Sequence, residues 1–233
     1  MHAIILAGGK GERLRPMTDH KPKPMVEVAG KPILEYQVEW LRAEGVTSVA
    51  VSCGYRHEVI QQYFGNGAKW GLEMHYAVES TPLGRGGGIK KALATLSESS
   101  LLDPVVVTNG DIITDLRLAS VLSQHVVTGA IATVVLAPFH SPYGVVEIDS
   151  RDRILGFKEK PELPYWVNGG IYLLDREVYE YLPDVGDIED ETFPRLANDG
   201  RLAAYRYRGF WRTIDTAKDL ATVGEELRRA QAA

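Results

Sequence analysis

The feature that most constrains the fold is a glycine-rich loop directly after a short apolar run near the start of the chain. The run His2–Leu6 is apolar on both faces, as in a strand buried inside a parallel sheet. Gly8, Gly9 and Gly11 follow it closely. Glycine lets a backbone approach a ligand and turn its N–H groups toward an anion. Because open α/β sheets bind ligands at the carboxyl ends of their strands, the loop predicts a phosphate-binding site.

This loop matches neither of the two common phosphate loops. A Walker loop ends in Gly-Lys-Ser/Thr, whereas Gly11 is followed by Glu12, and a dinucleotide fingerprint needs a glycine where Leu14 stands. The alternative is a tight strand-to-helix turn with basic surface residues. Arg13 and Lys23 weigh against that alternative, because two prolines hold Lys23 on a stiff segment. A rigidly placed ammonium suits the stabilisation of phosphate charge.

Further along, short apolar runs alternate with helical patterns, which predicts a doubly wound, Rossmann-like α/β sheet. Two more buried strands are expected at Ser48–Ser52 and Pro104–Thr108. Helical spacing recurs in three sets: Leu34, Val38 and Leu41; Ile89, Leu93 and Leu96; Leu220, Val223 and Leu227. From about residue 130, short strands follow one another with little helix between them, indicating a mixed sheet or a second lobe. They are Ala130–Leu136, Gly144–Ile148, Arg153–Lys158 and Gly170–Leu174.

Composition limits the class of protein. The 233 residues carry a net charge of −5, which favours neither nucleic acid nor an anionic membrane as a partner. No apolar stretch reaches the ~18 residues of a membrane span. The run Ala3–Ala7 is too short for a signal peptide, so the cytoplasm is the expected location. The single cysteine, Cys53, is expected to be a buried strand-end residue, and the histidines are expected to be structural or solvated.

The glycine-rich loop and the proline-rich lysine segment together resemble the sugar-1-phosphate nucleotidylyltransferases, also called nucleotide-sugar pyrophosphorylases. The family signature Leu-Ala-Gly-Gly-x-Gly-x-Arg-Leu-x-Pro-(Leu/Met)-Thr stands almost complete at residues 6–18, and Lys-Pro-Lys-Pro at 21–24. The resemblance continues in order through nearly the whole chain. Its further motifs are Pro82-Leu83-Gly84, Asn109-Gly110-Asp111, Tyr143-Gly144-Val145, Glu159-Lys160-Pro161, Asn168-Gly169-Gly170 and Gly209-Phe210-Trp211.

The resemblance implies a nucleotide-diphospho-sugar transferase fold in one domain, residues 1–233. Residues 1–125 would form the nucleotide-binding half, and residues 126–233 a smaller, β-rich sugar-binding half with the C-terminal helix. The implied reaction transfers a nucleotidyl group from a nucleoside triphosphate to a sugar 1-phosphate and releases pyrophosphate. The attacking phosphate oxygen is already an anion, so catalysis depends on positioning and on neutralising charge. The chain is also compatible with a homo-oligomer.

The resemblance also implies roles for individual residues. The catalytic residues would be Arg13, Lys23 and Asp111. The nucleotide-binding residues would be Leu6, Ala7, Gly8, Gly9, Gly11, Arg13, Gly84 and Asn109. The sugar 1-phosphate would be bound by Gly144, Glu159, Lys160, Asn168 and Gly169.

The implied cofactor is Mg²⁺, a hard cation that prefers carboxylate oxygens, and Asp111 would be its first ligand. Many family members read Trp-x-Asp-Ile-Gly near the C-terminus, and that aspartate is the second ligand. Here Thr213 stands at the expected place and Asp215 two positions later, as in glucose-1-phosphate cytidylyltransferases. We therefore expect Asp215 to be the second ligand. The alternative is an impaired site in a non-catalytic, nucleotide-sugar-sensing regulatory subunit, but intact Arg13, Lys23 and Asp111 argue against it.

The nucleotide is predicted less directly. Chain length and motif spacing resemble the mannose- and heptose-1-phosphate guanylyltransferases, which favours GTP with a manno- or heptose-type sugar 1-phosphate. Those enzymes tend to read Glu-Pro-Leu-Gly-Thr, whereas this chain reads Thr81-Pro82-Leu83-Gly84-Arg85. The Phe-Trp-x-x-x-Asp-Thr ending favours cytidylyl transfer to glucose 1-phosphate, and UTP or dTTP is a further alternative. Arg85 would contact phosphate or base, or cover the loop.

Overall fold

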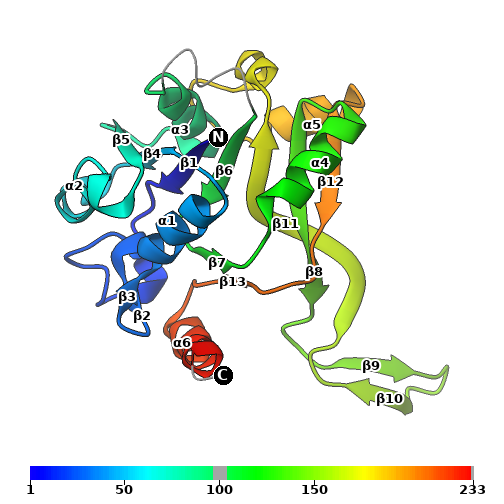
Figure 1. Cartoon of the computed structure of the whole chain (residues 1–233). Helices are drawn as coiled ribbons and strands as arrows, with labels where there is room; N and C mark the ends of the chain where they lie inside the picture. Colours follow the sequence, from blue (N-terminus) through cyan, green and yellow to red (C-terminus); the bar gives the residue numbers. More distant parts are fainter. Residues whose placement is uncertain (97–103, 232–233) are drawn as a thin grey trace.

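The computed structural model describes residues 1–96 and 104–231, and its main element is a seven-stranded mixed sheet (Figure 1). The strands are β1 (His2–Ala7), β4 (Ser48–Cys53), β5 (Glu73–Val78), β6 (Val105–Asn109), β8 (Ala132–His140), β11 (Glu162–Leu174) and β12 (Leu202–Arg206). Their order across the sheet is β12-β8-β11-β6-β1-β4-β5. Strands β1, β4, β5 and β6 are mutually parallel, whereas β11 runs antiparallel to β6 and β8. This arrangement confirms the predicted α/β class.

The strand order reverses at β1. The chain passes from β1 to β4 on one side and later returns to place β6 on the other. Such a switch point opens a crevice at the carboxyl ends of the strands, where ligands bind in this class of sheet. Leu6 on β1 pairs with Asn109 on β6. The glycine-rich loop after β1 therefore emerges beside the turn after β6.

Helices cover both faces of the sheet (Figure 1). On one face lie α1 (Ile33–Ala43), α2 (His57–Phe64) and α4 (Leu118–Thr128); on the other lie α3 (Gly84–Leu93), the 3-10 helix η5 (Arg176–Tyr181) and α5 (Thr192–Asn198). Ile5 packs in the first core, while its neighbour Ile4 packs in the second. Strand β1 is therefore buried on both faces, as its continuous apolar run predicts.

The last helix of the described chain packs against residues 14–33, close in sequence to the glycine loop. Strand β13 (Trp211–Thr213) pairs with β7 (Ile112–Thr114), and the helix α6 (Ala217–Gln231) follows. A third core joins α6 to the 3-10 helix η1 (Glu12–Leu14) and to the hairpin of β2 (Glu27–Val28) and β3 (Lys31–Pro32). Its buried members are Leu14, Val26, Val28, Ile33, Ile113, Ile214 and Val223.

Of the two expectations for the second half, the mixed sheet is the one observed. Strands β8, β11 and β12 extend the same sheet, whereas the hairpin of β9 (Val145–Ile148) and β10 (Ile154–Lys158) stands away from it (Figure 1). The strand expected at Gly170–Leu174 is the end of the longer β11. Pro164 and the Gly169-Gly170 pair hid its first part, where the register is irregular. Helices α2, α4, α5 and strand β5 were also missed.

Cys53 is buried at the end of β4, as expected. Burial raises the pKa of its thiol to about 12, so the thiolate form needed for nucleophilic chemistry is scarce at neutral pH. None of the described helices is long and apolar enough to cross a membrane.

The glycine-rich segment 84–88 forms the start of α3. The backbone N–H groups of Gly86 and Gly87 donate to the carbonyl of Gly186, at 2.9 Å and 3.3 Å. Close approach of residues 183–187 requires glycines here, because a Cβ at Gly87 would overlap the carbonyl oxygen of Asp184. The segment 183–187 therefore caps this helix.

Gly87→Ala is expected to destabilise the protein by about 1–3 kcal/mol, the usual cost of forcing extra volume into a packed contact. The matched control is Gly224→Ala in α6, where the nearest atom to a new Cβ is 3.6 Å away. Alanine favours a helix over glycine by ~1 kcal/mol, so the control should be neutral or stabilising. Denaturant unfolding measures both changes. Equal effects would mean that the 183–187 contact does not constrain α3.

Candidate active site

A pocket of about 660 Å³ opens at the carboxyl ends of β1 and β6. All the residues expected to bind the nucleotide line it, namely Leu6, Ala7, Gly8, Gly9, Gly11, Arg13, Gly84 and Asn109. Lys23, Asp111 and Asp215 line it as well. Among the described residues, no histidine lies in the pocket wall. The fold therefore gathers the expected nucleotide, catalytic and metal residues in one cavity.

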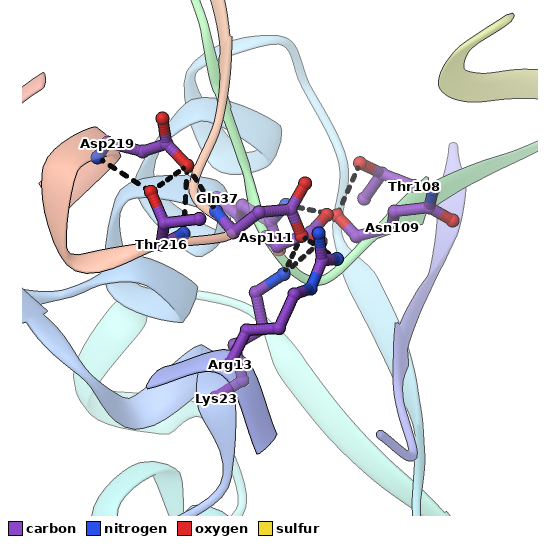
Figure 2. Close-up of polar contacts among 9 residues, drawn as sticks. Arg13, Lys23, Gln37, Thr108, Asn109, Asp111, Thr216 and Asp219 are labelled. Atoms are coloured by element: carbon purple, nitrogen blue, oxygen red, sulfur yellow. Dashed lines mark hydrogen bonds and ion pairs between the residues drawn. The ribbon is translucent and has the colours of Figure 1, made fainter. Parts of the chain in front are cut away.

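Ion pairs link four charged side chains of the pocket wall, namely Arg13, Lys23, Asp111 and Asp215. Figure 2 labels the first three of them. The Nζ atom of Lys23 lies 2.6 Å from Oδ2 of Asp111 and 2.7 Å from Oδ1 of Asp215. Arg13 Nη2 lies 2.8 Å from the same Asp215 oxygen. Only 14% of the Lys23 side chain is exposed, so solvent screens its ion pairs less than it would screen surface pairs.

The local sequence explains why Lys23 is held so firmly. It begins the 3-10 helix η2 (Lys23–Met25), preceded by Pro22 in an extended conformation and followed by Pro24. Gly11 has a left-handed φ of 65°, and a Cβ there would lie 2.7 Å from the Cβ of Lys23. The glycine loop and the lysine segment therefore pack directly against each other, which requires glycine at this position.

Asp111 is positioned by a turn with many contacts. Gly110 donates its N–H to the carbonyl of Leu6 at 2.8 Å, and Ile214 donates to the carbonyl of Asp111 at 3.0 Å. Gln37, from α1, donates to the carbonyl of Asn109 at 2.6 Å (Figure 2). Sequence reasoning missed Gln37, although a glutamine on the apolar face of α1 was a visible signal.

Asp215 lies just before α6, where Asp219 accepts from the backbone N–H groups of Asp215 and Thr216, at 3.1 Å and 2.8 Å. The Thr216 hydroxyl in turn accepts from the N–H of Asp219 at 3.3 Å, which completes the reciprocal arrangement of a capping box (Figure 2). Thr213 lies instead in β13, opposite Ile112, and is not part of the pocket wall. The structure thus brings Asp215 to the pocket wall, where it contacts the same Lys23 ammonium as Asp111.

The two carboxylates fit a hard divalent cation. Asp111 and Asp215 approach each other closely enough that the single ammonium of Lys23 contacts both. Carboxylate oxygens are the ligands that Mg²⁺ prefers, and it usually takes only one or two carboxylates and fills its other positions with water and substrate phosphates. In residues 1–96 and 104–231 we found no group of three or more His, Cys, Asp or Glu side chains that could hold a metal.

Glu79 also lines the pocket, beside Gly8 of the glycine loop, and was not anticipated. Its Oε1 accepts from the hydroxyl of Ser52 at 2.7 Å, and its Oε2 accepts from the N–H of Leu83 at 3.1 Å. The residue directly follows β5, at the same sheet edge as the glycine loop. It was missed because β5 itself was missed.

Arg85 also lines the pocket, fixed by an acidic segment from the second half. Its Nε lies 3.1 Å from Asp187 and its Nη1 lies 3.0 Å from Oε1 of Glu189. The backbone N–H of Arg85 also donates to Asp187, at 2.8 Å, which lowers the pKa of that carboxyl. The ion pairs with Asp187 and Glu189 hold the Arg85 side chain in the pocket wall.

The residues expected to bind the sugar are not in the pocket wall. Gly144 immediately precedes β9, while Glu159 and Lys160 follow β10, at the base of the projecting hairpin. Gly144 and Glu159 are neighbours, since a Cβ at Gly144 would lie 2.9 Å from a Glu159 carboxylate oxygen. Asn168 and Gly169 belong to β11, and the indole of Trp211 donates to the carbonyl of Gly169 at 2.8 Å.

A model of the nucleotidyl transferase family matches residues 2–230 of this chain. The mannose-1-phosphate guanylyltransferase of Mycobacterium tuberculosis is 35% identical, over 97% of this chain and 64% of that protein. A mannose-1-phosphate guanyltransferase of Schizosaccharomyces pombe is 36% identical, over 95% of this chain and 63% of that protein. A UTP–glucose-1-phosphate uridylyltransferase of Synechocystis is also 36% identical, over 94% and 60%. The chain thus spans less than two thirds of the length of these relatives.

Solved structures show the same fold. The crystal structure of HddC from Yersinia pseudotuberculosis has a TM-score of 0.76 and 25% identity, over 97% of this chain and 99% of that chain. The complex of HddC with GMP-PN has a TM-score of 0.77 and 24% identity, with the same coverage.

Proposed function

This chain belongs to the nucleotidyl transferase family, and we propose that it transfers a nucleotidyl group from a nucleoside triphosphate to a sugar 1-phosphate, releasing pyrophosphate. The observation that carries the proposal is the convergence of Arg13, Lys23, Asp111 and Asp215 beside a glycine loop in one pocket. Such a cluster can position phosphates and neutralise their charge, which is most of what this reaction needs.

In this proposal the backbone of Gly8–Gly11 and the side chain of Arg13 hold the triphosphate. A phosphate oxygen of the sugar 1-phosphate attacks the α-phosphorus in line, and the bond from that phosphorus to the pyrophosphate oxygen breaks. The attacker is already ionised, so no general base is required. Lys23 stabilises the charge on the α-phosphate, and its low exposure strengthens that interaction.

Asp111 and Asp215 would hold Mg²⁺ in this proposal, because their oxygens converge and have the right chemistry. When bound, the cation would supply positive charge that offsets the charge of the triphosphate oxygens. The two aspartates would otherwise repel each other and any polyphosphate. The two aspartates keep two carboxylate oxygens close together beside Lys23, where the phosphates would be bound.

We propose GTP as the nucleotide. Two of the relatives named above are mannose-1-phosphate guanylyl transferases, which supports guanine with a manno-configured sugar. Glu79 adds a physical argument: guanine has adjacent N–H donors on its Watson–Crick edge, and a carboxylate can accept from both. Uracil and thymine offer a single N–H between two acceptors. Cytidylyl transfer to glucose 1-phosphate is the second candidate, because of the Asp215-Thr216 ending.

The sugar side of the proposal depends on the motif match. Gly144, Glu159 and Lys160 at the hairpin base, with Asn168 and Gly169 on β11, would bind the sugar 1-phosphate. The proposed location is the cytoplasm.

Pyrophosphate release, measured for five nucleoside triphosphates against several sugar 1-phosphates, tests the proposal. We expect GTP with mannose 1-phosphate to be the best or second-best pair. In Glu79→Gln, kcat/KM should fall about tenfold more for GTP than for UTP, because guanine loses a charged acceptor. The control is Glu73→Gln, an exposed position at the other end of β5.

Two other results of these pyrophosphate-release measurements would change the proposal. Preference for CTP with glucose 1-phosphate would replace the guanine proposal with cytidylyl transfer. No release from any pair, in a protein that still binds nucleotide-sugars, would indicate the regulatory alternative.

A further inference from the structure

A continuous set of polar contacts joins the nucleotide pocket to β11. It begins at Arg85 in the pocket wall, whose Nη1 contacts Oε1 of Glu189 at 3.0 Å. The hydroxyl of Tyr172 donates to the same Glu189 oxygen at 3.0 Å. Asn168 Nδ2 in turn donates to the Tyr172 hydroxyl at 2.9 Å. Three chain segments from both halves of the sequence contribute to this set, which we call the Glu189 relay.

Tyr172 is the fixed centre of the Glu189 relay. Its side chain is fully buried in the second core and packs edge-on against Phe193, with ring centroids 5.0 Å apart. Burial raises the pKa of its hydroxyl, so the group stays protonated at physiological pH. It therefore donates its one proton to Glu189 and accepts from Asn168. The ring cannot turn this hydroxyl elsewhere without disturbing the core.

The relay fixes the orientation of the Asn168 amide, although this residue is exposed. The amide oxygen accepts from the N–H of Gly170 at 2.8 Å, and one amide hydrogen is taken by Tyr172 at 2.9 Å. The second hydrogen of Nδ2 remains, in a direction set by these two contacts. Asn168 is thus a prepared donor for an oxygen of a ligand, such as a sugar hydroxyl or phosphate oxygen.

Glu189 is more than a counter-charge for Arg85. The Asp187 carboxylate already accepts hydrogen bonds from both the side chain and the backbone N–H of Arg85. Glu189 places one oxygen between two donors, while its other oxygen, Oε2, is buried without a hydrogen-bond partner among the described residues. A buried carboxylate oxygen without a partner costs stability. A role in arranging both Arg85 and Tyr172 accounts for its presence there.

We propose that Glu189 is a positioning residue that sets Arg85 in the nucleotide pocket and, through Tyr172, sets the Asn168 amide that receives the sugar 1-phosphate. The inference rests on the proposed function, since it names residues that prepare the two substrate sites. In this proposal the contact with Arg85 serves the nucleotide, and the contacts through Tyr172 to Asn168, the Asn168 arm, serve the sugar 1-phosphate. The KM values for the two substrates can therefore separate the two roles.

The test is a comparison of KM and kcat for both substrates in relay variants, with GTP and mannose 1-phosphate as the probes. Tyr172→Phe should raise the KM for mannose 1-phosphate about tenfold and leave the KM for GTP within about twofold, because only the Asn168 arm is lost. Glu189→Ala should raise both KM values. Glu189→Gln keeps an acceptor oxygen and should recover most of the sugar effect. Tyr76→Phe is the matched control, since its hydroxyl donates to Gly65 at 2.6 Å, outside the pocket wall.

Melting temperatures of all variants separate positioning from folding. If Glu189→Ala fails to fold, Tyr172→Phe and Glu189→Gln still decide the matter. An active wild type whose Tyr172→Phe variant shows equal changes in both KM values, or none, would overturn the relay while leaving the proposed function intact. A wild type that releases no pyrophosphate from any pair would overturn the proposed function itself.

Discussion

Lys23→Ala is expected to lower turnover by ~10²–10³, the usual loss when one preorganised electrostatic contact to a transition state is removed. The ammonium lies between Asp111 and Asp215 at one end of the pocket, where the α-phosphate would be held. Alanine removes the charge but leaves the proline-stiffened backbone in place. Turnover should therefore fall far more than thermal stability does.

Lys21→Ala is the matched control for this prediction. Lys21 stands on the same proline-rich segment, but its ammonium contacts Glu27 at 3.8 Å and is not part of the pocket wall. Steady-state pyrophosphate release and thermal melting should be measured on both variants. A Lys23→Ala protein that melts as the wild type does and keeps more than half its activity would remove Lys23 from the mechanism.

Asp111→Asn and Asp215→Asn are each expected to raise the Mg²⁺ concentration needed for half-maximal turnover by about 100-fold or more. Even groups that only support a metal ligand typically cost ~10–100-fold in affinity. The double variant should cost little more than either single one, because residues that act as a unit are not additive. The measurement is a Mg²⁺ titration of turnover for each variant.

The control for this titration is Asp19→Asn, an exposed aspartate paired with Arg15 at 3.6 Å. Thr213→Ala tests the alternative second ligand and should behave as the wild type does, because Thr213 is outside the pocket wall. If Thr213→Ala lost turnover while Asp215→Asn kept the wild-type Mg²⁺ dependence, the second metal ligand would be Thr213 and not Asp215.

Much of the fold was predictable because it depends on local patterns. The apolar run of β1, the glycines after it and the Asn109-Gly110-Asp111 turn can each be recognised within a few residues. The alternation of apolar runs with helical patterns predicted the α/β class, and the structure confirms it. Asp215 was preferred to Thr213 because of a motif, and the structure places Asp215 in the pocket wall, two residues after the β13–β7 pairing ends.

The rest could not be predicted because it depends on contacts between distant segments. Arg85 and Asp187 are 102 positions apart, and nothing periodic in the sequence connects them. Glu79 was hidden because the pattern of β5 alternates weakly between apolar and polar positions. The sugar-binding residues show the reverse case: their motifs are clear, yet the structure does not bring them to the wall of the nucleotide pocket.

The pairing of Arg13 with Asp215 also bears on how the protein is made. These residues are in contact but 202 positions apart, so the ribosome synthesises Arg13, Lys23 and Asp111 long before it reaches Asp215. Until Asp215 is made, the emerging chain carries the glycine loop without the carboxylate that completes the cluster. A ligand stabilises only the conformations that bind it. Substrates that need the whole cluster can therefore protect only a chain that has grown past Asp215, and not the earlier intermediates that chaperones must shield.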